Sequence, residues 1–157
     1  MRITFCTVNE AKRFTNYLSS RYGISPSVFQ SCAWITYQES VFLTTKEWVS
    51  LSTEKNLNLF SIGIQAFTDG KTFQPTTNFI TLLGEHIRRN IVELPEEKMV
   101  SFFEGKKMPV EEGKSIQLFS PGWVAIRLNN KIIGSAGLKG RHLIPNLPFF
   151  SHAHENE

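Results

Sequence analysis

Residues 121–148 read PGWVAIRLNNKIIGSAGLKGRHLIPNLP, and this stretch decides the fold of the chain. In its first half, over 123–128, every second residue is a branched aliphatic one, which predicts a strand with one apolar face. The pair Asn129-Asn130 follows and is compatible with a type I′ hairpin turn. A second strand over 131–138 then completes a hairpin. Short strands joined by close turns predict a small β-barrel in the last third of the chain.

The middle of the chain adds short helices and further strands. A helix opens at Pro75-Thr76-Thr77 and closes near Gly84. A second helix begins at Pro95, where proline suits the first helical position, and ends at Gly105. We expect their buried faces to consist of Phe79, Ile80, Leu82 and Leu83 in the first and Met99, Val100, Phe102 and Phe103 in the second. Further strands are predicted over 59–67, 90–94 and 115–119.

The first third of the chain has a different pattern. Apolar residues spaced by three and four predict a helix over 9–22, with Thr7 or Asn9 as its cap and Gly23 as its end. A short helical turn from Pro26 to Phe29, a hairpin of strands over 33–37 and 41–44, and a short helix from 45 to about 51 follow. These elements predict a small α+β unit over 1–53, with a polar linker over 52–58 behind it.

Composition limits the class of protein. The chain has 157 residues, of which 41% are hydrophobic and 20% charged, which is typical of a globular protein. No run of about 18 apolar residues occurs, and the N-terminus lacks the apolar stretch of a signal peptide. The two cysteines, Cys6 and Cys32, form neither a disulfide framework nor a metal-binding spacing. We therefore expect a cytoplasmic protein that does not bind membranes.

The charges are distributed unevenly. The 17 Lys and Arg residues exceed the 14 Asp and Glu residues by three. Between residues 85 and 112, seven acids accompany five bases. Between residues 113 and 154, five bases occur and no acid. An acid-free basic segment is what a polyanion-binding surface requires, although a chance fluctuation on a solvated face would look the same.

Signatures of enzymes are missing from the sequence. The chain has no G-x-G-x-x-G fingerprint, no P-loop and no G-x-S-x-G elbow. A nucleophilic cysteine would need a nearby base, and His86 is the only histidine before residue 140. The tail residues His152 and His154 supply two ligands without a third, so they do not define a metal site. We expect no catalytic residue, cofactor or metal.

Three runs of sequence carry a family resemblance. They are FQPTT at 73–77, SFFEGKKMPV at 101–110, and the stretch 121–148 quoted above. In this order they resemble the PUA-like RNA-binding domain at the C-terminus of Sun-type cytosine-5 RNA methyltransferases. The methyltransferase domain itself, which would need about 200 residues, has no counterpart in the chain. The helix, the run RYGI at 21–24 and the hairpin within 1–53 resemble the α+β module that precedes PUA domains in ribosome-biogenesis factors.

The resemblance implies an organisation and a function. The organisation is a pre-PUA-like α+β domain over 1–53, a PUA-like mixed β-barrel with short helices over 59–150, and a mobile tail over 151–157. The function is non-catalytic binding of structured RNA, either rRNA or tRNA, during its maturation or modification. The RNA-binding residues implied are Lys139, Gly140, Arg141, His142 and Asn146, extended by Arg127, Lys131, Lys106 and Lys107. Lys139 and Arg141 would contact phosphates, and Gly140 would let the backbone come close.

Two other hypotheses remain open at the level of sequence. The first is a protein-interaction adaptor, whose N-terminal unit docks an RNA-modifying enzyme or a ribosome-assembly protein through Phe14, Phe29, Trp34 and Trp48. An exposed apolar patch on that unit would favour it. The second is an enzyme with a small-molecule site, which a deep pocket containing His86 or a cysteine with a base would favour.

Overall fold

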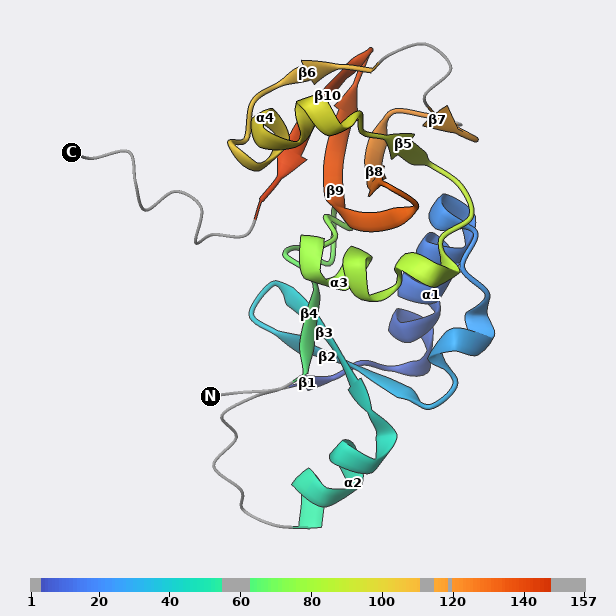
Figure 1. Ribbon diagram of the computed structural model, residues 1–157. Helices are drawn as coiled ribbons and strands as arrows, with labels where there is room; N and C mark the ends of the chain where they lie inside the picture. The colour runs from blue at the N-terminus through green and yellow to red at the C-terminus, as the bar shows by residue number, and fades with distance from the viewer. Residues whose placement is uncertain (1–3, 55–62, 111–114, 119, 148–157) are drawn as a thin grey trace, which may run out of the picture. The chain divides into compact units, whose positions relative to one another are not determined.

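The computed structural model describes residues 4–54, 63–110, 115–118 and 120–147 (Figure 1). The chain divides into two compact units, Met1–Gln74 and Pro75–Glu157. Each unit has a sheet of its own and short helices, so the fold class is α+β as expected. The expected tail over 151–157 lies outside the described residues.

Unit 1 has a four-stranded antiparallel sheet in the order β1-β2-β3-β4. The helices α1 and α2 and the 3-10 turn η1 accompany it (Figure 1). The bounds are β1 Thr4–Phe5, α1 Val8–Tyr22, η1 Pro26–Phe29, β2 Cys32–Tyr37, β3 Ser40–Thr45, α2 Lys46–Glu54 and β4 Ile64–Phe67.

Helix α1 confirms the expected helix and explains its ends. Thr7 is the cap: its hydroxyl accepts a hydrogen bond from the backbone N–H of Glu10, whose carboxylate accepts one from the backbone of Thr7. Gly23 ends the helix in the left-handed region, with φ of 70°. The 15-residue helix between them buries Phe14, Leu18 and Tyr22.

The boundary between the units differs from the expected one. Strand β4 pairs with β3, and its residues Ala66 and Phe67 are fully buried. The segment 64–67 therefore belongs to the first sheet and not to the barrel. Helix α2 also continues through Glu54, across the start of the linker expected over 52–58. The rest of that linker lies outside the described residues.

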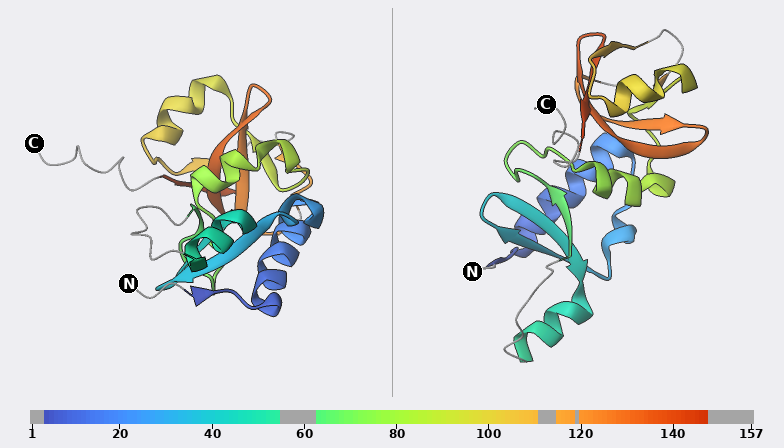
Figure 2. Two further views of the ribbon diagram at one scale, coloured as in Figure 1. Left: turned by 90° about the horizontal axis from the view of Figure 1, so that it is seen from below. Right: turned by 60° about the vertical axis from the view of Figure 1, so that its left-hand side comes forward.

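Unit 2 has a six-stranded sheet in the order β6-β10-β9-β8-β5-β7, which curls on itself (Figures 1 and 2). All neighbours pair antiparallel except β5 and β8, which run parallel. The helical bounds are α3 Thr77–Leu82, η2 Gly84–His86, η3 Glu96–Lys98 and α4 Met99–Phe103. The strand bounds are β5 Ile91–Glu93, β6 Met108–Pro109, β7 Ser115–Ile116, β8 Gly122–Leu128, β9 Lys131–Lys139 and β10 His142–Asn146.

The hairpin of β8 and β9 confirms the element on which the sequence argument rests. Asn129 and Asn130 have φ of 48° and 64°, as a type I′ turn requires. Strand β10 was not expected, because only Gly140 and Arg141 separate it from β9 and no cluster of turn residues marks the reversal. One face of these strands forms the core of unit 2, which contains Val92, Leu94, Phe102, Met108, Val124, Ile126, Ala136, Leu138 and Leu143.

Helix α4 buries less than the sequence predicts. Phe102 is buried, whereas Met99, Val100 and Phe103 are 39%, 61% and 50% exposed. The segment from Glu96 is a 3-10 turn followed by a helix of only five residues. Its apolar residues point in several directions around the axis, so one short turn cannot bury them all. Leu82 at the end of α3 is likewise 62% exposed. No helix in the described part of the chain is long and apolar enough to cross a membrane.

Candidate nucleic-acid interface

Four of the expected site residues lie at one tight turn, which we call the basic turn: Lys139, Gly140, Arg141 and His142. Lys139 is the last residue of β9 and His142 the first of β10, and the two are register partners. Gly140 has φ of 58°, a conformation that favours glycine, and no atom lies within 4 Å of the position a Cβ would take. All four residues are exposed. The backbone N–H of Val110 donates to the carbonyl of Arg141 at 2.8 Å, which fixes the turn to the edge of the sheet.

The hairpin that leads to the basic turn contains bases and no acid. The strands that lead to it, β8 to β10, contain no acidic residue, and none occurs from 113 to 154. Side chains that project from these strands therefore add positive charge or none. A surface of this kind attracts polyanions by long-range electrostatics.

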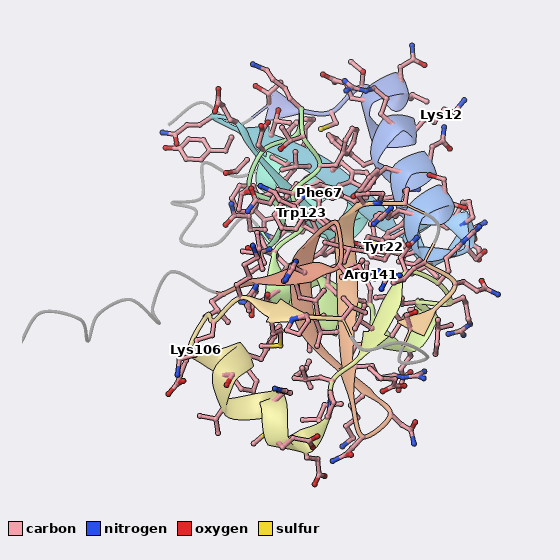
Figure 3. All side chains as sticks on the ribbon, turned by 90° about the horizontal axis from the view of Figure 1, so that it is seen from above. Lys12, Tyr22, Phe67, Lys106, Trp123 and Arg141 are labelled. Carbon is pink, nitrogen blue, oxygen red and sulfur yellow. The ribbon has the colours of Figure 1, made fainter. Side chains whose placement is uncertain are left out.

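Lys106 and Lys107 lie on the same edge of the sheet but further along it. They precede β6, in which Met108 pairs with Leu143 of β10. Because Val110 is level with Arg141, Lys107 lies three residues, or about 10 Å, along the edge from the basic turn. Both lysines are exposed, and the ammonium group of Lys106 forms an ion pair with Glu104 at 2.5 Å. Lys106 and Arg141 are labelled in Figure 3.

The structure does not bring Arg127 and Lys131 to this cluster. The guanidinium group of Arg127 forms an ion pair with Glu93 on the neighbouring strand β5, and the two residues are register partners. Lys131 begins β9, whereas Lys139 ends it. Eight residue steps of an extended strand cover about 26 Å, so Lys131 lies at the opposite end of the hairpin.

Asn146 is partly buried, and its side chain forms hydrogen bonds within unit 2. Its side-chain N–H₂ donates to the backbone carbonyl of Pro75 at 2.6 Å and to the hydroxyl of Ser135 at 3.1 Å. The backbone carbonyl of Asn146 accepts a hydrogen bond from the hydroxyl of Thr77. Ser135 is fully buried. The side chain that the resemblance assigned to RNA thus ties the start of α3 to β9 and β10.

A further surface, which sequence reasoning missed, adjoins the basic turn. Gly137 of β9 is the register partner of Trp123 on β8 and of Ile144 on β10. Partners in antiparallel strands point to the same side of a sheet, and so do alternate residues. We call the side that bears Trp123, Gly137, Ile144, Lys139 and His142 the outer face. Trp123 covers Gly137, since its Cζ3 atom lies 3.4 Å from the position a Cβ would take there.

The sequence contains both residues of this pair, but their pairing depends on the register of the hairpin. A tryptophan six residues before the hairpin turn and a glycine seven residues after it become partners once the register is known. The register shifts between Ile126 and Arg127, where β9 contains one extra residue, so counting from the turn alone misses the pairing by one position.

Unit 1 contains both cysteines, Cys6 and Cys32, and no histidine in its sequence, so within this unit neither thiol has an imidazole base. Both thiols are free and partly exposed. Burial, and next the charge of Glu10, raises the pKa of the Cys6 thiol to about 11, against a hydrogen bond with Thr36 that lowers it. A thiol with a raised pKa is a weak nucleophile at neutral pH.

A hollow on unit 1 has mixed charge. It has a volume of about 350 Å³, and its charged lining residues are Glu10, Arg13, Glu39, Asp69 and Lys71. Asp69 already accepts hydrogen bonds from the backbone of Lys71 and the hydroxyl of Thr72. Neither a cysteine nor a histidine lines this hollow. Among the residues described, no group of three or more metal-ligating side chains occurs.

The aromatic residues of the adaptor hypothesis are mostly interior. Phe14, Phe29 and Trp34 are 4%, 6% and 5% exposed. The ring of Trp34 lies 5.2 Å from that of Phe14 and 5.6 Å from that of Phe29. These three rings form part of the core of unit 1 rather than a docking patch, and only Trp48 of the four is partly exposed.

The chain was compared with protein-family models and with curated proteins, and neither comparison found a match.

Proposed function

We propose that this chain is a non-catalytic RNA-binding protein of the pre-PUA plus PUA type, acting in the maturation or modification of rRNA or tRNA. The observation that carries the proposal is the basic turn, which gathers Lys139, Arg141 and His142 on one exposed reversal of an acid-free hairpin. Unit 2 is a curled sheet accompanied by short helices, which is the α+β class that the proposal requires. RNA binding then depends on unit 2, and unit 1 supports it or contacts a partner.

The chemistry of this binding is electrostatic in the first place. Lys139 and Arg141 donate hydrogen bonds to phosphate oxygens, and the guanidinium group offers the fork geometry that phosphates favour. Gly140 brings the backbone within reach of the sugar–phosphate chain because no side chain covers it. Lys106 and Lys107 extend the positive edge in the direction of β6.

The test is a fluorescence-anisotropy titration of a labelled RNA hairpin at several salt concentrations. The double variant Lys139→Ala plus Arg141→Ala is compared with a control, Lys12→Ala plus Lys131→Ala. The control removes the same charge from exposed positions on α1 and at the far end of β9. We expect the slope of log affinity against log salt to fall by nearly two in the first variant, because two phosphate contacts are lost.

Two results would overturn the proposal. Absence of binding to any structured RNA at low salt would exclude RNA as the ligand. Equal losses in the two double variants would show that net charge, and not the basic turn, determines the affinity.

A further inference from the structure

We infer that the outer face beside the basic turn holds the terminal phosphate of an RNA chain, bound jointly by Lys107, His142 and Lys139. We call these three residues the basic triad. The inference deepens the proposed function and rests on it, because it specifies which part of an RNA the site selects.

Three neighbouring strands bring the basic triad together. Lys139 ends β9 and is the register partner of His142, which begins β10, so their Cβ atoms are about 5 Å apart. On its other side, His142 is the register partner of Pro109 in β6. Lys107 precedes Pro109 by two residues, which makes it the diagonal neighbour of His142, with the Cβ atoms about 7–8 Å apart. The histidine therefore lies between the two lysines.

The triad lies on the open side of the sheet. Met108 is 5% exposed and belongs to the core of unit 2, whereas Lys107 and Pro109 on either side of it are exposed. Alternate residues of an extended chain point to the same side, so Lys107 points away from the core. Lys139 and His142 are exposed on that same side. This corner of the outer face is therefore accessible to a ligand.

The charge of the triad is not neutralised within the described part of the chain. No carboxylate of a described residue forms an ion pair with any of its three side chains. Glu104 pairs instead with Lys106, the neighbour of Lys107. The strands β6, β9 and β10 contain no acid. Because like charges at neighbouring positions of a sheet repel one another, an anion bound between them is stabilising.

The three donors can meet at one group. Each lysine has its ammonium group on a flexible four-carbon stem, so both can lean over the imidazole between them. An N–H of His142 donates the third hydrogen bond. The adjoining turn presents the exposed Gly140 and Arg141 to the linkage that follows along the chain.

This arrangement provides charge for one phosphate rather than for a row of them. The nearest residues along the outer face are Pro109, Ile144 and Gly137, none of which is charged, so a second phosphate there would meet no cation. A phosphodiester has one negative charge, whereas a phosphate monoester has about −1.5 to −2 at pH 7. The monoester gains more from three donors. The triad therefore favours the end of a chain over an internal linkage.

The experiment uses the full chain, which retains Glu111 and Glu112, and unlabelled uridine 12-mers that displace the labelled RNA hairpin. The 12-mers have a 5′-phosphate, a 3′-phosphate, or hydroxyl groups at both ends, and uridine 5′-monophosphate represents the free nucleotide. Lys107→Ala and His142→Gln each remove one donor of the triad. Lys106→Ala is the matched control, because Lys106 is the adjacent exposed lysine and pairs with Glu104.

We expect a phosphorylated 12-mer to bind about tenfold more tightly than the hydroxyl 12-mer, because hydrogen bonds to charged groups are the stronger ones. The 5′ and 3′ probes identify which end enters the site. The preference should fall to about threefold or less in Lys107→Ala and in His142→Gln. Lys106→Ala should change both affinities by the same factor and leave their ratio unchanged. Circular dichroism of each variant verifies that the fold is retained.

The outcomes separate the two proposals. If phosphorylated and hydroxyl 12-mers bind equally, or if Lys106→Ala lowers the preference as much as Lys107→Ala does, the terminal-phosphate site is overturned while the proposed function stands. If uridine 5′-monophosphate displaces the hairpin as strongly as the phosphorylated 12-mer, the ligand is a small phosphate ester and the assignment to an RNA end is overturned. If neither the 12-mers nor any structured RNA binds at low salt, the proposed function fails and the site fails with it.

Discussion

The side chain of Asn146 joins three segments of unit 2 that are far apart in the sequence. Its amide donates to Pro75 and to Ser135, which is fully buried. Removing the hydrogen-bond partner of a buried backbone or hydroxyl group destabilises a protein much more than breaking an exposed hydrogen bond does. We therefore expect substitution of Asn146 to lower the stability of the fold and to leave RNA binding unchanged.

We expect Asn146→Ala to lower the free energy of unfolding by about 2 kcal/mol, because the Ser135 hydroxyl and the Pro75 carbonyl lose their partner. Urea unfolding followed by circular dichroism measures this change. RNA affinity, measured where the variant is fully folded, should remain within about twofold of the wild type.

Lys139→Ala is the matched comparison and should show the opposite pattern. It should weaken RNA binding while leaving the unfolding free energy within about 0.5 kcal/mol, because the residue is exposed at a strand end. If Asn146→Ala instead weakened RNA binding at unchanged stability, the amide would be a ligand for RNA, as the resemblance implied.

At the residue scale, the sequence predicted which charged residues lie together better than it predicted the partners and the exposure of individual side chains. Lys139, Arg141 and His142 lie together because they are neighbours in the chain, so no knowledge of register was needed. Arg127 was misjudged because its partner Glu93 is 34 residues away and becomes a neighbour only when β5 pairs with β8. Trp123 was missed because its partial exposure depends on which side of the sheet is the core.

Helix α4 is the element whose burial pattern differs most from the expected one. Phe102 packs among the core residues of unit 2, and its Cε1 atom lies 3.8 Å from the position a Cβ would take at Gly134 on β9. The neighbouring Phe103 is half-exposed, although its ring lies only 5.5 Å from that of Phe102. The two phenylalanines therefore form a natural pair for testing the orientation of the helix.

We expect Phe102→Ala to destabilise the protein by about 3–5 kcal/mol, because it leaves a cavity in the core. Phe103→Ala should cost less than about 1 kcal/mol, since little of its burial is lost. Thermal or urea unfolding of the two variants measures the difference. Similar losses in both would mean that the helix buries both rings, as its sequence suggested.

Elements with local signals were predictable, and elements defined by distant partners were not. Helix α1 and the turn at Asn129-Asn130 are specified by a capping box and by residues that accept positive φ. Strands β1 and β6 contain two residues each and exist only because a longer strand lies beside them. A two-residue strand has no periodicity, so the sequence cannot reveal it.

On the scale of the whole molecule, the division into units follows from the pairing of β4. This strand supplies Phe67, whose ring stacks on those of Phe14 at 5.6 Å and Trp34 at 6.2 Å in the core of unit 1. The sequence alone placed β4 with the barrel, because a polar stretch precedes it and no local feature identifies its partner. Composition marks where a chain is polar, whereas a domain boundary is where few contacts cross.

We expect a fragment of residues 1–74 to unfold cooperatively, because it contains the whole four-stranded sheet. A fragment of residues 1–58 should not, since it lacks β4 and leaves the edge of β3 unpaired. Urea titrations of the two fragments, followed by tryptophan fluorescence, measure cooperativity. A cooperative transition in the shorter fragment would contradict the division after Gln74. The fragment 75–157 is the complementary control and should retain the six-stranded sheet.

The bonds that Asn146 makes have a topological consequence. Pro75 is the first residue of unit 2 and Asn146 ends its last strand, so the entrance and the exit of the six-stranded sheet lie one hydrogen bond apart. A module with adjacent ends can be spliced into a surface loop of another protein without stretching its host. For the same reason, its ends could be joined by a short peptide and new termini opened at Asn129-Asn130, with every strand of the sheet keeping its neighbours.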